Sequence, residues 1–102
     1  MNFQELQNKI VQNAMNYGKK YNIEIDEEFA LLKLYEEVGE MTQAILIHKK
    51  KSRPEKHLDE KTSKNEIAKE MADVLGMLML NAQLLEIDLE NALIKKWIDK
   101  KT

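Results

Sequence analysis

The segment from Met71 to Leu80 constrains the fold most, because it is apolar at nearly every position and yet carries one charged residue, Asp73. Such a segment predicts a helix that is buried on most of its faces. An ionised carboxylate in a dry helix interface is strongly destabilised unless it is paired or bound to a metal. Lys69, one turn earlier, is a weak partner, and Glu70 adds a like charge. Asp73 therefore needs a partner from elsewhere in the chain.

A second acidic group lies in the segment 33–44, KLYEEVGEMTQA, where Glu36, Glu37 and Glu40 project from one flank of a predicted helix. Packing of the two acidic helices would bring Glu37 and Glu40 to Glu70 and Asp73, and four carboxylates in one pocket are unstable as bare anions. Mg²⁺, or Mn²⁺ as the alternative ion, would stabilise it, because hard divalent cations prefer oxygen ligands. Gly39 indicates close approach by another helix or a ligand. These residues alone leave a metal site and a solvated acidic flank both open.

The chain of 102 residues is expected to form one domain, residues 1–102, and three glycines and one proline favour an all-α fold. A core of this size is marginal, so we expect a homo-oligomer. The absence of cysteine excludes disulfides, thiolate zinc sites and cysteine nucleophiles. With no signal peptide, no long apolar run and a net charge of −2, we expect a cytoplasmic protein that binds neither membrane nor nucleic acid.

Four helices are expected, and the first two have clear signals. The first runs from Phe3 to roughly Tyr17, with apolar residues at three- and four-residue intervals and Gly18 as a stop. The second follows Asp26, a good N-cap, and runs to about His48.

Residues 49–64 differ in composition from the rest of the chain, with a net charge of +4. Pro54 and Ser52 argue against a continuous helix here. We expect a basic flexible loop, and a lysine-rich lid that meets a polyphosphate is the other interpretation.

The last two helices follow this loop. Ser63 and Glu66 fit a capping box, so the third helix should start near Asn65 and end near Leu85. Asp88 can cap a fourth helix. The apolar positions of that helix and its basic end are Leu89, Leu93, Trp97, Lys100 and Lys101.

Other hydrolytic and metal chemistries do not fit the sequence. A di-iron bundle needs Glu-x-x-His pairs, and neither His48 nor His57 has a glutamate three residues before it. The only glycines are at positions 18, 39 and 76, so the sequence contains neither a glycine-rich phosphate loop nor a Gly-x-Ser-x-Gly elbow.

Three segments follow one another in the order of a known signature: KLYEEVGEM, EMADVLGML and EIDLENALIKK. The first contains EExxE and the second ExxD, and together they resemble the MazG-type all-α nucleoside triphosphate pyrophosphohydrolases. The similarity covers roughly residues 30–98. It implies a four-helix MazG-like bundle, with the active site formed by the second and third helices, that assembles as a homodimer or a dimer of dimers.

The resemblance also implies Mg²⁺-dependent hydrolysis of the α–β phosphoanhydride of a nucleoside triphosphate, which gives a nucleoside monophosphate and pyrophosphate. Carried over by position, the metal ligands are Glu37, Glu40, Glu70 and Asp73. Glu36 matches the first glutamate of EExxE and is expected to help position metal or water. The candidate substrate-binding residues are Lys96 and Asn81.

Two alternatives remain open beside this reading. Phosphoribosyl-ATP pyrophosphohydrolases and dimeric dUTPases share these carboxylates within the same superfamily. A non-catalytic helical module that binds a nucleotide or a partner protein is the alternative of another class. The sequence departs from the family at Gly76, where relatives usually carry a bulkier residue.

Overall fold

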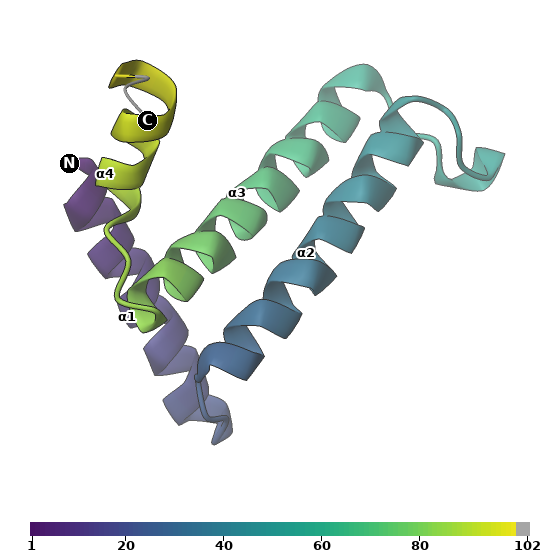
Figure 1. Ribbon diagram of the computed structural model, residues 1–102. Coiled ribbons are helices and arrows are strands. Elements are labelled where there is room, and N and C mark those ends of the chain that lie inside the picture. Colours follow the sequence, from purple (N-terminus) through teal and green to yellow (C-terminus); the bar gives the residue numbers. More distant parts are fainter. Residues whose placement is uncertain (100–102) are drawn as a thin grey trace.

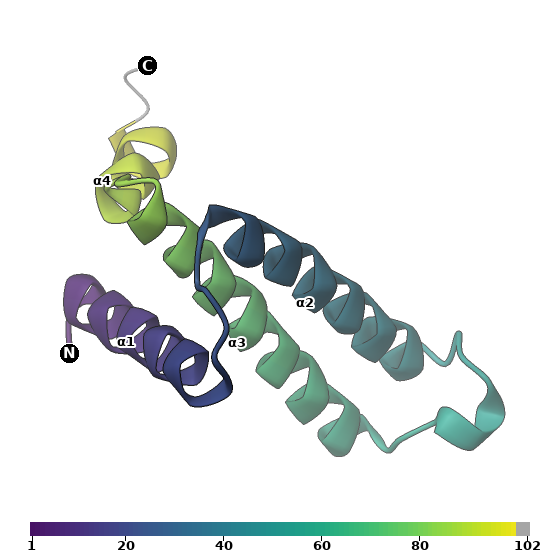
Figure 2. The same cartoon turned by 90° about the horizontal axis from the view of Figure 1, so that it is seen from below.

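The computed structural model describes residues 1–99 and is all-α over that range. Three long helices dominate it: α1 (Phe3–Tyr21), α2 (Glu27–His48) and α3 (Glu60–Leu84) (Figure 1). The helices α2 and α3 form an antiparallel hairpin, and α3 lies between α1 and α2 in Figure 2. The predicted all-α class is therefore confirmed, whereas the expected basic end at 100–101 lies outside the described residues.

The end of α1 differs from the prediction, because Gly18 does not stop the helix but lies buried inside it. The helix continues to Tyr21 and ends at Asn22, which adopts a left-handed conformation with φ 55°. The chain then folds back closely enough that Ile23 donates its backbone N–H to the Gly18 carbonyl oxygen at 2.8 Å. Glycine at position 18 makes room for this return.

The boundaries of α2 agree with the prediction. The carboxylate of Asp26 accepts a hydrogen bond from the backbone N–H of Phe29 at 2.8 Å. This bond satisfies one of the free donors at the helix start. The helix ends at His48, and Lys49 follows as its C-cap.

The start of α3 was predicted wrongly, because Asp59 rather than Ser63 caps it, accepting a hydrogen bond from the Thr62 backbone N–H at 3.3 Å. The basic connection therefore spans 49–59 and contains one short 3₁₀ turn, η1 (Pro54–Lys56). Ser63 is instead buried in the first turns of the helix.

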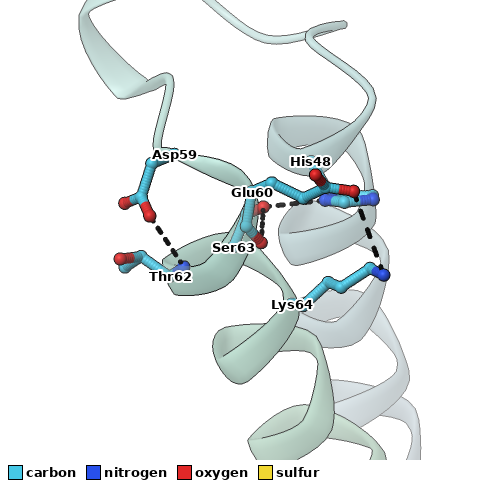
Figure 3. A network of polar contacts seen from close by, with 6 residues as sticks. All are labelled: His48, Asp59, Glu60, Thr62, Ser63 and Lys64. Carbon is cyan, nitrogen blue, oxygen red and sulfur yellow. Dashed lines mark hydrogen bonds and ion pairs between the residues drawn. The ribbon is translucent and has the colours of Figure 1, made fainter.

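The buried Ser63 joins the two helices of the hairpin at its closed end. Its hydroxyl oxygen lies 2.7 Å from Nδ1 of His48 and donates to the Glu60 carbonyl oxygen at 3.1 Å (Figure 3). Ser63 therefore does not cap α3, and its hydroxyl links α3 to the end of α2.

The core of the single chain is small and lies where α3 packs between its neighbours. Fully buried side chains include Ala30 of α2 and Met79 and Leu80 of α3. The prediction that α3 is buried on most faces is wrong for one chain, because Met71, Leu75 and Leu78 are 53%, 47% and 40% exposed. The apolar surface of α3 thus exceeds what one chain covers.

The fourth predicted helix exists but is short. Asp88 caps α4 (Leu89–Leu93) by accepting a hydrogen bond from the Asn91 backbone N–H at 3.0 Å, as expected. The chain then widens into a π-helix, η2 (Ile94–Asp99), which contacts mainly α4. Within the described part of the chain, no helix combines the length and the apolar composition needed to cross a membrane.

Candidate active site

Three carboxylates meet at the middle of the hairpin. Glu37 of α2 and Glu70 and Asp73 of α3 each place an oxygen within 4.8 Å of the others. The reason is helical periodicity: these residues lie on the line along which α2 and α3 touch, in register with Ala30 and Asn81 at the open end. The sequence therefore makes the two long helices pack through acidic side chains at this level.

Two of these carboxylates, Glu37 and Glu70, lack within residues 1–99 the partners that burial requires, whereas Asp73, expected in a dry interface, is exposed. The Oε2 atoms of Glu37 and Glu70 are buried and have no hydrogen-bond partner among the described residues. Burial, followed by the charge of Glu40, raises the pKa of Glu37 from 4.5 to about 7. Burial and then the charge of Glu40 also raise the pKa of Glu70. The group is therefore electrostatically strained without a cation.

Glu40 and Glu36, the other two acids of the α2 signature, lie differently. Glu40 is exposed, and its charge acts on both Glu37 and Glu70, so it borders the three-carboxylate group. Glu36 lies outside the group and accepts a hydrogen bond from Nζ of Lys33 at 2.7 Å. The side chain of Glu36 is 54% exposed.

The two residues that were expected to contact substrate lie apart from these acids. Both amide hydrogens of Asn81 are used in packing, because Nδ2 donates to the Ala30 carbonyl oxygen at 2.9 Å and to that of Met77 at 2.8 Å. Lys96 is exposed on η2. Lys69 pairs with Glu66 at 3.2 Å rather than with an acid of the group.

Two clefts open beside the carboxylates. The larger, which we call the α1 cleft, has a volume of about 600 Å³ and lies between α1 and the hairpin, with Glu37 and Asp73 in its wall. The smaller, of about 420 Å³, has Glu40 and Glu70 in its wall and Leu58 of the basic connection at its edge. The acidic group thus faces open space on both sides, which a substrate can reach.

The α1 cleft also contains residues that the sequence pattern did not single out as functional. Lys33 of α2 and Lys9, Asn13 and Tyr17 of α1 line it. The spacing Lys-x-x-Glu-Glu in the α2 signature was a signal for Lys33, since it puts an ammonium group one turn before the carboxylates. The α1 residues carried no such signal, because only the packing of α1 brings them here.

The donor set fits a hard divalent cation. It consists of carboxylate oxygens alone, and two of these oxygens are buried with no partner in the described part of the chain. The sequence contains no cysteine. Mg²⁺ and Mn²⁺ prefer such ligands, and a cation would relieve the repulsion that raises the pKa of Glu37. Glu37, Glu70 and Asp73, with Glu40 beside them, are the residues that could hold it.

Comparison with protein-family models gives one match, to the MazG nucleotide pyrophosphohydrolase domain, over residues 18–102. The chain belongs to the MazG family. Searches of curated proteins and of solved structures each gave no significant match. Family membership supports nucleotide pyrophosphohydrolase activity in general, and the MazG match includes α2 and α3 with all five signature acids.

Within the MazG family match, the basic connection 49–59 joins the ends of α2 and α3. One of its lysines, Lys50, donates to the Leu58 carbonyl oxygen at 3.3 Å within the connection. Leu58 is the residue of this connection that lines a described cleft. The cations beside Glu37 and Asp73 come instead from α1 and α2.

Proposed function

We propose that this MazG-family protein is a Mg²⁺-dependent nucleotide pyrophosphohydrolase. It cleaves the α–β phosphoanhydride of a ribo- or deoxyribonucleoside triphosphate to give the monophosphate and pyrophosphate, with a house-cleaning role in the cytoplasmic nucleotide pool. One observation carries the proposal: oxygens of Glu37, Glu70 and Asp73 converge within 4.8 Å, and two buried oxygens of this group have no partner among the described residues.

The metal would be held by Glu37, Glu70 and Asp73. Glu40 would be a fourth ligand or would bind a water molecule beside the metal. Bound there, Mg²⁺ would neutralise charge on the phosphate oxygens and lower the pKa of a neighbouring water. Mn²⁺ has the same ligand preference and is the alternative ion.

The protein's own side chains would orient the attacking water and contact the substrate. Glu40 stays in contact with water, so its carboxylate can accept a hydrogen bond from an attacking water and orient it. Residues of α1 form the side of the α1 cleft that faces Glu37 and Asp73 and can contact a bound substrate there. Glu36 accepts a hydrogen bond from Lys33 and lies outside the group of three carboxylates.

We also propose that the protein works as a homodimer or a dimer of dimers. Two stripes of exposed apolar side chains, one on α2 and one on α3, have the same residue spacing. Each stripe begins one residue after a residue of the α2–α3 contact line: Leu31 follows Ala30, and Met71 follows Glu70. In an antiparallel pair, positions related in this way project from the same side. The α2 stripe is Leu31, Tyr35 and Val38, and the α3 stripe is Met71, Leu75 and Leu78.

The direct test is product analysis with purified protein, Mg²⁺ and a panel of standard and modified nucleoside triphosphates. Monophosphate plus pyrophosphate is expected, and Glu40→Gln and Asp73→Asn should abolish turnover while circular dichroism remains unchanged. Glu60→Gln, an exposed acid near the start of α3, serves as the matched control and should retain activity. Diphosphate plus phosphate would show that a different bond is cleaved, and no turnover of any nucleotide would refute the proposed function.

A further inference from the structure

The α1 cleft combines two kinds of charge in one space. Glu37 and Asp73 line one part of it, and Lys33 from α2 and Lys9 from α1 line another part. A triphosphate is itself strongly negative, so carboxylates alone would repel it even when a divalent cation offsets part of their charge. The lysines supply positive charge that the acidic group lacks.

Lys33 is held in this position by a local ion pair. Its Nζ lies 2.7 Å from Oε1 of Glu36, three residues later on the same helix, and its side chain is 34% exposed. A pair between solvent-accessible groups of this kind contributes little to stability. The ammonium group can therefore change partners when a group with more negative charge enters the cleft. The hydrogen bond that Lys33 donates to Glu36 raises the pKa of Lys33, so the ammonium group stays charged.

Other residues that line the α1 cleft suit the base and sugar of a nucleotide. Tyr17 of α1 and Phe29 of α2 contribute aromatic surface, and Asn13 contributes an amide. Ring faces stack on any base, and an amide can donate to or accept from base edges. The volume of about 600 Å³ falls within the range of small-molecule sites.

We propose that Lys33 binds the triphosphate of the substrate in the α1 cleft, exchanging its bond to Glu36 for bonds to phosphate oxygens, and that Glu36 is a positioning residue for Lys33. The proposal rests on the proposed function and adds a phosphate-binding residue to it. Lys9, from the opposite wall, provides a second and longer-range attraction for the same phosphates.

The test compares Lys33→Met with Lys69→Met in steady-state assays of the nucleotide that the wild-type protein turns over best. Lys69 forms the same kind of exposed ion pair, with Glu66 three residues away at 3.2 Å, but lines neither described cleft, so it is a matched control. Loss of a charge-assisted hydrogen bond should raise KM about 10- to 100-fold in Lys33→Met. We expect kcat to change less than about threefold, and Lys33→Arg to recover part of the loss.

A binding measurement separates phosphate recognition from catalysis. With a non-hydrolysable α,β-methylene triphosphate and Mg²⁺, Lys33→Met should weaken affinity by a similar factor, and the corresponding monophosphate should lose less. Glu36→Gln removes the charge that positions Lys33 and should weaken this affinity, but less than Lys33→Met does.

The outcomes distinguish this inference from the proposed function. If the wild-type protein cleaves nucleotides but Lys33→Met keeps the KM and analogue affinity of Lys69→Met, Lys33 does not bind phosphate and only this inference fails. A fall in kcat with unchanged KM and affinity would equally overturn it. Absence of turnover in the wild-type protein would refute the proposed function itself.

Discussion

Glu37 shows how burial and crowding act on one side chain. Its Oε2 is buried without a hydrogen-bond partner among the described residues, and burial, with the charge of Glu40 next, raises its pKa from 4.5 to about 7. The folded state therefore binds this proton more tightly than the unfolded state. Stability from this group is complete below pH 4.5 and is lost as the pH rises through about 7.

The metal-free protein is thus expected to lose stability between pH 4.5 and about 7, by on the order of 2 kcal/mol. Glu37→Gln cannot ionise and should lose much less over the same interval. Urea unfolding in the presence of a chelator, measured at several pH values, gives both curves. Equal slopes for the two proteins would contradict the assignment of this effect to Glu37.

Glu70 supplies a test of metal binding that does not depend on turnover. Its buried Oε2 has no hydrogen-bond partner over residues 1–99, and burial raises its pKa. Glu70→Gln should stabilise the metal-free protein, because it removes one of several like charges. In thermal melting, Mg²⁺ should raise the Tm of the wild-type protein and have little effect on the variant. An equal Mg²⁺ shift in both proteins would place the cation elsewhere.

At the scale of elements, the sequence predicted helix starts that depend on a single capping residue. Asp26 and Asp88 cap helices as expected, since a side-chain acceptor at the N-cap acts only on the next turn. Ser63 was expected to cap α3, but Asp59 caps it and the Ser63 hydroxyl contacts His48 of α2. That contact joins two elements, so the sequence pattern alone could not reveal it.

The candidate site likewise has a part that local sequence patterns indicate and a part that depends on packing between helices. Periodicity on α2 and α3 indicated that Glu37, Glu40, Glu70 and Asp73 could meet, but it left a solvated acidic flank open. The structure brings Glu37, Glu70 and Asp73 together, and Glu40 borders them. The α1 wall of the cleft depends on how α1 packs against α3, and no local pattern encodes that placement.

Gly18 and Gly39 are both helical glycines and should respond oppositely to alanine. A Cβ at position 18 would lie 2.7 Å from the Ile23 carbonyl oxygen and 2.5 Å from Cγ1 of Ile25. Gly18→Ala should therefore cost about 1–3 kcal/mol. A Cβ at position 39 meets no described atom within 4 Å, so Gly39→Ala should stabilise the helix by about 0.5–1 kcal/mol.

Chemical unfolding of the two variants measures this contrast. The expected close approach to Gly39 is not present within one chain, over the residues that the structure describes. Destabilisation by Gly39→Ala would show that another chain or a ligand covers this position, whereas tolerance of Gly18→Ala would show that the α1–α2 turn can relax.

At the scale of the whole molecule, the single chain is too extended for its length. Its radius of gyration is 16.1 Å, whereas a compact domain of about 100 residues has one of about 13 Å. The excess arises because α1, α2 and α3 lie in a row, as Figure 2 shows, and one face of the hairpin remains uncovered. The α2 and α3 stripes lie on that face, and neither lines the α1 cleft. A second copy of the hairpin would bury both stripes and leave the cleft open.

This arrangement predicts that a charge in the α3 stripe dissociates the oligomer. Leu78→Glu should yield a monomer in sedimentation velocity at concentrations where the wild-type protein is a dimer or tetramer, because burying an unpaired carboxylate is unfavourable. Leu6→Glu on α1 is the matched control, since Leu6 is 41% exposed and Leu78 40%. A wild-type monomer, or an oligomer that survives Leu78→Glu but not Leu6→Glu, would show that the stripes are not the interface. Helical content should remain in the monomer, since the α2–α3 contact line is separate from the substituted face.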